Sequence, residues 1–365
     1  MAGPLSWTVL FLTISFGAFS VEGNNKGLIV STFSSWAVPA QLQVYHNDPS
    51  TFKTNTPTSK TRISLSGNTI ITSLVANTGS NSLLVLDANT NTIYNYENFN
   101  LHMNHTSRKF SKVHTGVSAT TSQIAVDWYT GNVYWTDGFY KYVATHPLRF
   151  QDNTSVYKIL ISRHLTKPEG IAVDPDKRYL FWSDVIGAKS KIERSSTTGS
   201  HRTVIVQNDN PKWISSLALD TDNEKIYWAD RGRQTVEYCN YDGSDRKVLR
   251  RILHAAFVSI TMSKDVVCGT EYNYRNVMCL DKSTGNTTWF SSYTYRLPWA
   301  IAVFDNEQQK ITSTENPCHG NSCSHMCFNT DANTATCGCK EGYKLMADNE
   351  SCKSVDGLLF GKSII

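Results

Sequence analysis

Cysteine is the residue type whose spacing in this chain points most directly to chemistry. Nine cysteines occur in 365 residues, and six of them fall in one stretch near the C-terminus: Cys318, Cys323, Cys327, Cys337, Cys339 and Cys352. That stretch is rich in Gly and Asn and lacks apolar periodicity, so it needs disulfides in place of a core. Such bridges form in oxidising compartments, and we therefore expect an extracellular protein. Spacing alone leaves many pairings open.

The other three cysteines lie earlier in the chain. Cys268 and Cys279 flank Gly269 to Met278, a segment that could fold back as a hairpin and place the two cysteines on facing strands. We therefore predict a bridge between them. Cys239 is left over, and it is either a buried free thiol, which we favour, or half of an intermolecular bridge.

Catalytic motifs and nucleic-acid signatures are missing from the sequence. The ten histidines are scattered, and there is no HExxH, no Gly-x-Ser-x-Gly and no metal-spaced pair. The net charge is only +4 and the basic residues are dispersed, which argues against a nucleic-acid partner. The single basic run, Arg246 to Arg251, is interpreted as a solvated strand end that could make a weak glycosaminoglycan contact.

A repeated sequence motif, called a phrase below, predicts the strands that position these residues. Gln123 to Asp137 reads QIAVDWYTGNVYWTD, Glu169 to Asp184 reads EGIAVDPDKRYLFWSD, and Ser215 to Asp230 reads SSLALDTDNEKIYWAD. The tryptophans of the three phrases are 47 and 46 residues apart, which is the length of one propeller blade. A repeat of this length cannot bury its apolar face alone, so several copies are expected to stack around one axis.

Each phrase predicts the two innermost strands of a blade. A short apolar run ends in Asp, a polar turn follows, and a second run ends in aromatic-Trp-small-Asp. Because a buried carboxyl must be hydrogen-bonded, we expect the final residues Asp137, Asp184 and Asp230 to strap neighbouring backbone, a structural role and not a catalytic one.

Degenerate copies complete a ring. Ser259 to Met262 with Asp265 to Glu271 forms one copy, and Ser73 to Ala76 with Leu83 to Asp87 forms another. Ala300 to Val303 resembles an innermost strand that lacks a second strand. Gly27 to Thr32 resembles a second strand that lacks an innermost strand. We therefore predict an all-β, six-bladed propeller whose closing blade takes its innermost strand from the C-terminal end. Closure of this kind removes exposed sheet edges.

The YWTD-type phrases resemble the class B repeats of the low-density lipoprotein receptor family, which are also found in nidogen. The resemblance covers nearly all of the chain after residue 27 and implies a propeller over residues 21–315. Residues 316–353 resemble an EGF-like module, with Cys337-Gly338-Cys339 and Gly342-Tyr343 before the last cysteine. This resemblance implies the bridges Cys318–Cys327, Cys323–Cys337 and Cys339–Cys352. The approach Thr314-Glu315-Asn316-Pro317 lacks the acidic cluster of a calcium-binding module.

Targeting signals agree with secretion. Residues 1–20 contain an apolar stretch and small residues at Ala18 and Ser20, which predicts a cleaved signal peptide, with an uncleaved anchor as the alternative. No later stretch is apolar for long enough to span a bilayer, and residues 354–365 form a short tail. Four Asn-x-Ser/Thr sequons predict glycosylation at Asn104, Asn153, Asn286 and Asn349.

A binding function is favoured over an enzymatic one. Six-bladed propellers include calcium-dependent lactonases and esterases, which arrange a Glu and several Asn or Asp side chains around an axial metal. Glu169, Asn77 and Asp305 would be the candidates here, but no motif groups them. The segments that start the blades instead place Pro, Trp and Ser at the rim, which does not resemble a cage for a hard cation. We expect no metal and no cofactor.

The resemblance implies a binding face made by the loops that enter the innermost strands and those that follow the second strands. The candidate contact residues there are Phe139, Tyr140, Glu169, Trp213 and Trp299. Exposed aromatic residues are typical interface anchors, although some of these could only cap the central channel. The expected function is a secreted, non-catalytic binder of an extracellular protein, as a matrix or adhesion component or soluble binder. A fragment of a cargo or signalling receptor is the alternative.

Overall fold

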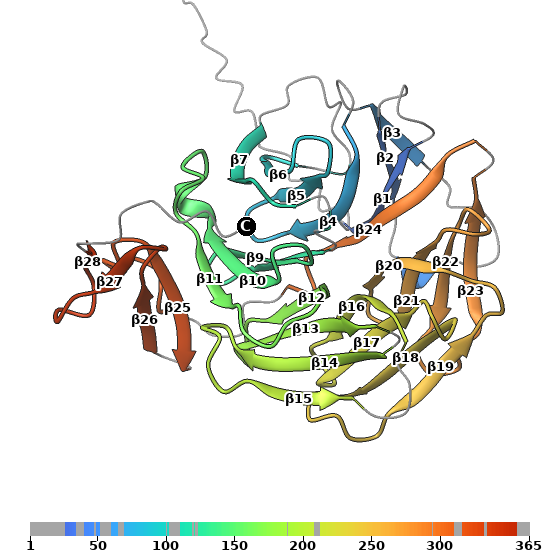
Figure 1. The fold of residues 1–365 in the computed structure, drawn as a ribbon. Coiled ribbons are helices and arrows are strands. Elements are labelled where there is room, and N and C mark those ends of the chain that lie inside the picture. Colours follow the sequence, from blue (N-terminus) through green and yellow to red (C-terminus); the bar gives the residue numbers. More distant parts are fainter. Residues whose placement is uncertain are drawn as a thin grey trace, which may run out of the picture.

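The structure is a computed structural model, and it describes residues 26–33, 40–46, 49–51, 60–64, 69–99, 101, 110–118, 120, 123–187, 189–207, 212–293, 295–309, 316–331 and 334–355. The expected signal peptide, the sequon at Asn104 and the tail beyond residue 355 lie outside these ranges. The described residues form six four-stranded sheets arranged around one axis, and two small hairpins beside them (Figure 1).

Each sheet is one blade, and its strands are given from the axis outward. Blade 1 consists of β24 (Leu297–Asp305), β1 (Lys26–Phe33), β2 (Gln41–His46) and β3 (Lys60–Ser64). Blade 2 consists of β4 (Ile71–Asn77), β5 (Ser82–Asp87), β6 (Thr92–Tyr96) and β7 (Phe110–Thr115). Blade 3 consists of β8 (Ile124–Asp127), β9 (Asn132–Asp137), β10 (Tyr142–Pro147) and β11 (Lys158–Ile161).

The second half of the ring repeats this plan. Blade 4 consists of β12 (Pro168–Asp174), β13 (Tyr179–Ile186), β14 (Lys189–Ser196) and β15 (Thr203–Val206). Blade 5 consists of β16 (Ile214–Asp220), β17 (Lys225–Asp230), β18 (Thr235–Asn240) and β19 (Lys247–Arg251). Blade 6 consists of β20 (Phe257–Met262), β21 (Val266–Glu271), β22 (Asn276–Asp281) and β23 (Thr287–Ser292). Two short 3-10 helices, η1 (Pro49–Thr51) and η2 (Leu148–Phe150), lie between strands.

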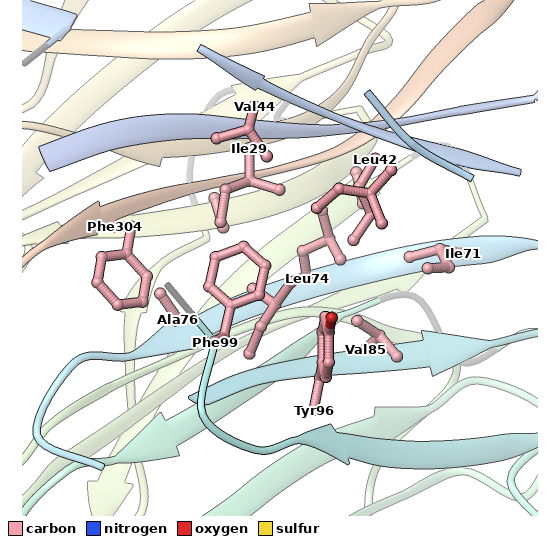
Figure 2. Packing of buried hydrophobic residues seen from close by; sticks show 14 of the residues in the cluster. Ile29, Leu42, Val44, Ile71, Leu74, Ala76, Val85, Tyr96, Phe99 and Phe304 are labelled. Atoms are coloured by element: carbon pink, nitrogen blue, oxygen red, sulfur yellow. The ribbon is translucent and has the colours of Figure 1, made fainter. Parts of the chain in front are cut away.

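The ring closes by joining the two ends of the propeller, as the sequence predicts. Strand β24 pairs antiparallel with β1, so that Leu28 lies opposite Val303 and Ile29 opposite Ala302. Where blades 1 and 2 meet, Phe304 packs against Phe99 with 5.7 Å between ring centroids, within a cluster drawn from both ends of the chain (Figure 2). Neighbouring blades bury each other's apolar faces, so no blade has a complete core alone.

Hydroxyl side chains tie each blade to the next. The small residue of the repeated motif donates to a backbone carbonyl of the following blade: Thr136 Oγ1 to Glu169 O, and Ser183 Oγ to Ile214 O at 3.0 Å. Ala229 replaces this residue in blade 5, where Ser215 Oγ donates to Phe257 O at 2.9 Å instead. The small position in the motif therefore has a hydrogen-bonding role between blades, which sequence reasoning did not assign.

The cysteine-rich segment folds as two hairpins, β25 (Met326–Asp331) with β26 (Thr334–Gly338), and β27 (Tyr343–Leu345) with β28 (Cys352–Ser354). The structure bridges Cys318 to Cys327, Cys323 to Cys337 and Cys339 to Cys352, the pairs that the EGF-like resemblance implies. In blade 6, Cys268 lies opposite Cys279 on β21 and β22 and is bonded to it. Cys239 is a free thiol buried in the core shared by blades 4 and 5.

The EGF-like module docks on blade 3, beside β10 and β11 (Figure 1). Met326 and Phe328 of the module pack against Val156 in an apolar contact. Around this contact Asn132 Nδ2 donates to Cys327 O at 2.7 Å, and Arg149 donates to Cys323 O at 2.7 Å. The module is thus held by a small apolar core with polar contacts around it, the arrangement of a specific interface.

Two buried histidines support the loop that meets this module. His114 is stacked on the motif tryptophan Trp135, and its Nδ1 bonds Thr154 O at 3.1 Å. Nε2 of His146 bonds Asn153 O at 3.1 Å. Burial, together with the nearby His146, lowers the pKa of His114 to about 4, and burial also lowers the pKa of His146.

Within the described part of the chain, no helix has the length and the apolar character needed to cross a bilayer.

The tryptophans of the motif should be essential to stability. Trp182 is completely buried in the core between blades 3 and 4, so Trp182→Ala should lower the free energy of unfolding by about 3–5 kcal/mol. The well-exposed Phe139 provides the control, because Phe139→Ala should leave the melting temperature nearly unchanged. Thermal unfolding of both variants decides the matter, and equal melting temperatures would contradict this assignment of β13.

The two histidines should make stability depend on acid. Because the folded-state pKa of His114 is lowered, the unfolded chain takes up a proton first as the pH falls, and stability present above pH 6.5 is lost towards pH 4. The loss should reach about 3 kcal/mol for His114. Denaturant unfolding between these pH values should show it, and a His114→Phe variant should have a flatter profile. If the free energy of unfolding depends on pH equally in both proteins, His114 is not the cause of this dependence.

Candidate functional site

The loops of one face of the ring are anchored by the carboxyl groups of the motif. We call this side the upper face: it carries the loops that lead into the innermost strands and the turns between second and third strands. The opposite side is the lower face. Asp230 accepts hydrogen bonds from the amides of Lys212 and Trp213, at 2.9 and 3.1 Å, and from that of Arg233 at 2.9 Å. A single carboxyl group therefore holds a loop and a turn together.

The same strap recurs around the ring. Asp184 accepts from the amides of Thr166 and Lys167. In blade 3, Asp137 binds Ser118 as well as the amides of Phe139 and Tyr140. Glu271 takes this role in blade 6, where it binds the amides of Ala256, Asn273 and Tyr274. These carboxyl groups are structural, and their effect is to set the loops that display the side chains of the upper face.

Trp213 is held in place at the mouth of the ring. Its Nε1 donates to Glu169 Oε2 at 2.6 Å, and Lys167 Nζ lies 4.6 Å from the centre of its ring while pairing with Glu169 Oε1. The side chain of Glu169 is buried beneath these contacts, whereas 39% of Trp213 stays exposed. Glu169 is thus placed to position the indole, and it does not present its carboxylate to a ligand.

Trp213 and Trp299 are linked through two residues that lie between them. The guanidinium of Arg231 lies 5.4 Å from the centre of the Trp213 ring and 5.9 Å from that of Tyr272. Tyr272 in turn meets Trp299 edge to face, with 5.9 Å between ring centroids. Together with Lys167, these residues form a row of cations and aromatic rings that runs from blade 4 across blades 5 and 6 to blade 1. Such contacts favour a fixed arrangement.

Phe139 and Tyr140 form a second group, on blade 3. Their rings meet edge to face at 5.1 Å, and Tyr140 stacks on Tyr142 at 6.1 Å. Both are well exposed, Phe139 by 67% and Tyr140 by 57%. The predicted aromatic residues therefore share one face but form two groups.

Sequence reasoning missed several members of this face. Exposed apolar side chains that it did not select lie there as well: Ile186, Leu253, Tyr272, Tyr274 and Tyr295. A usable signal existed for Tyr272 and Tyr274, because they follow Glu271 as Phe139 and Tyr140 follow Asp137. Arg231 was not among the residues that sequence reasoning selected.

The lower face lacks such a gathering of exposed apolar side chains in the described residues. The remaining large apolar side chains that are exposed in the described residues lie on outermost strands (Phe110, Val204, Val248 and Phe290) or in the EGF-like segment (Tyr343, Met346 and Val355). The lower turns of the described blades contribute none. The described sequons also avoid the upper face: Asn153 and Asn286 lie in lower turns, and Asn349 lies in the EGF-like module.

The enzymatic candidates are separated. Glu169 lies at the upper start of β12, whereas Asn77 and Asp305 end their strands at the lower side. A cavity of about 210 Å³ lies along the axis, and the side chain of Gln123 crosses it to bond Ile171 and Leu217. These three residues cannot converge on one axial ion.

Four of the other charged groups near the cavity are paired. Asp220 forms an ion pair with Lys282 at 2.5 Å, and Lys26 pairs with Asp305 and Glu307. In the described part of the chain, His325, Cys339 and Cys352 form the one cluster of possible metal ligands, and both of its sulfurs belong to a disulfide. Such a cluster offers a metal only the imidazole.

Comparison with known proteins agrees with this architecture. No family model matches the chain. It is 29% identical over 244 residues to a vitellogenin receptor of Solenopsis invicta, covering 67% of this chain and 13% of that protein. It is 27% identical over 232 residues to vitellogenin receptor Yl of Drosophila melanogaster, covering 63% of this chain and 11% of that protein. The chain thus spans about an eighth of the length of these relatives.

A solved structure shows the same fold. The nidogen chain of a nidogen/laminin complex matches with a TM-score of 0.65 and 18% identity, covering 76% of this chain and 98% of that one. Together with the motif straps and the closed ring, these likenesses identify the main domain as a six-bladed YWTD-type propeller, similar to those of low-density lipoprotein receptor-type proteins and of nidogen.

Proposed function

We propose that this protein is a non-catalytic module that binds an extracellular protein through the upper face of its propeller. The observation that carries the proposal is the gathering of exposed aromatic and apolar side chains on that face, against none on the lower turns of the described blades. Exposed apolar side chains that gather in this way mark interaction sites. Fixed aromatic side chains are also the usual hot spots of interfaces.

The likenesses support binding. The relatives are named as receptors for vitellogenin, and the nidogen structure contains laminin, so related propellers serve proteins that recognise other proteins. Docking of the EGF-like module on the lower side of blade 3 leaves the upper face open. Glycans on Asn153, Asn286 and Asn349 would leave it open as well.

We further propose an extracellular location, to which the four disulfides are suited. The protein would act as a secreted matrix, adhesion or soluble binding component, or as part of a receptor ectodomain. Its likeness to segments of vitellogenin receptors favours the receptor-type alternative more than sequence reasoning did.

The aromatic anchors should carry the affinity. The full chain, immobilised and exposed to native extracellular fluid, should capture a protein that mass spectrometry identifies. Trp213→Ala and Trp299→Ala should each weaken this capture by about 2 kcal/mol or more, because truncating a hot spot removes its packing. Secretion should be unchanged.

Two outcomes would contradict the proposal. If both variants bind like the parent, the contact lies elsewhere, most simply on the EGF-like module. If the chain hydrolyses lactones or aryl esters and EDTA abolishes the reaction, the enzymatic alternative is right. Capture of a protein that survives EDTA favours the binding module.

Glu169 should act by holding Trp213. Glu169→Ala removes the acceptor for the indole N–H, so Trp213 should become mobile and ligand affinity should fall by about 1–2 kcal/mol. Glu169→Gln keeps an acceptor and should behave more like the parent. In 19F NMR of 5-fluorotryptophan-labelled protein, the Trp213 resonance should shift in the Ala variant while the Trp182 resonance stays. An unmoved Trp213 resonance would remove Glu169 from this role.

A further inference from the structure

The charges of the propeller are segregated between its two faces, and this bears on the kind of ligand that the upper face accepts. The inference rests on the proposed function, since it concerns the same surface. Basic side chains project from the upper loops of blades 3 to 6. Those that are exposed are Lys141, Arg163, Lys189, Lys212 and Arg275.

Several of these cations lack an acidic partner. Lys141, Lys189 and Lys212 form no ion pair within the part of the chain that the structure describes. Arg231, half-buried between the rings of Trp213 and Tyr272, is not neutralised by a carboxylate there either. The face that carries the aromatic anchors therefore also carries uncompensated positive charge.

The acidic side chains that the structure describes on this face are all withdrawn from solvent. Asp87, Asp137, Asp184, Asp230 and Glu271 bind loop backbone, and each is at most 3% exposed. The carboxylate of Glu169 pairs with Lys167 and accepts a hydrogen bond from Trp213. The remaining acid of the upper loops, Asp209, lies outside the described residues.

On the lower turns, in contrast, acidic side chains are exposed. Exposed carboxylates occur there on most blades: Asp152, Asp222, Glu224, Asp242, Asp245, Asp265 and Glu307. The lower side also has exposed lysines, of which Lys177 pairs with Glu224 and Lys247 with Asp245. Net positive charge next to exposed aromatic rings is thus confined to the upper face of the described propeller.

We infer that the ligand of the upper face is an acidic protein segment that also carries aromatic or branched apolar side chains. Its carboxylates would meet the lysines of blades 3 to 5, since complementary charge steers association and excludes wrong partners. Its apolar side chains would pack on the row from Trp213 to Trp299 and on Phe139.

A protein segment fits this surface better than a sulfated polysaccharide. A polysaccharide would satisfy the lysines but offers few apolar groups to cover Phe139, Tyr140, Leu253 and Tyr295, each more than half exposed. The basic run that sequence analysis marked for glycosaminoglycans is partly used internally, because Arg246 pairs with the buried Glu237 at 2.9 Å. Lys247, Arg250 and Arg251 of this run remain exposed on β19, and Lys247 pairs with Asp245.

The probe for the test is a random dodecapeptide library displayed on phage and panned against the full chain. The enriched peptides should have net negative charge and contain aromatic or branched aliphatic residues. One such synthetic peptide is then measured by surface plasmon resonance. Lys189→Glu/Lys212→Glu should lower its association rate constant by about tenfold, and more at low ionic strength. Lys344→Glu, an exposed charge reversal in the EGF-like module, is the matched control and should change nothing.

Each other outcome is decisive. Neutral or basic enriched peptides would overturn the inference. Acidic peptides that are lost in Trp213→Ala but indifferent to the charge reversal would also overturn it, while leaving the proposed function intact. Peptides indifferent to both changes would reject the proposed function itself. Enrichment of no peptide, with heparin binding that Lys189→Glu/Lys212→Glu abolishes, would replace the protein segment by a polysaccharide.

Discussion

The architecture depends on a carboxyl group buried at the end of each motif strand. A buried carboxyl is costly unless it is hydrogen-bonded, and the donors within reach are the amides of one loop and one turn on the upper face. Asp184 and Asp230, for example, draw those segments inward. The requirement is local and structural, yet its consequence is that the side chains displayed by these loops have fixed positions.

Contacts between blades fix the positions of these loops relative to one another. Hydroxyls such as that of Ser183 reach the backbone of the next blade, and pairing of β24 with β1 completes blade 1 from the two ends of the propeller. The row of Lys167, Trp213, Arg231, Tyr272 and Trp299 spans four blades, so its geometry exists only while the ring is closed. Pre-organised side chains lose little entropy on binding, which suits a recognition surface.

The two faces of the propeller carry different groups. The lower side carries the EGF-like module, through Arg149 and Asn132, and the described sequons of the propeller. On the upper side the described acids are buried, whereas aromatic and basic groups are exposed. Exposed basic groups beside apolar anchors suit the acidic protein ligand proposed above, because complementary charge favours one partner over others.

The sequence by itself determined the repeat, the number of blades and the closing strand, because strand pattern and turn residues are properties of one segment. The resemblance to EGF-like modules implied the cysteine pairs that the structure forms. Only the tertiary structure decided that Glu169 serves Trp213, that Arg231 and Tyr272 join Trp213 to Trp299, and that His114 and His146 lie beneath the loop at the module. These contacts form only when blades stack and bring separate segments of the chain together. Burial, which decides whether a charged group meets solvent, protein or a ligand, likewise cannot be seen in a single repeat.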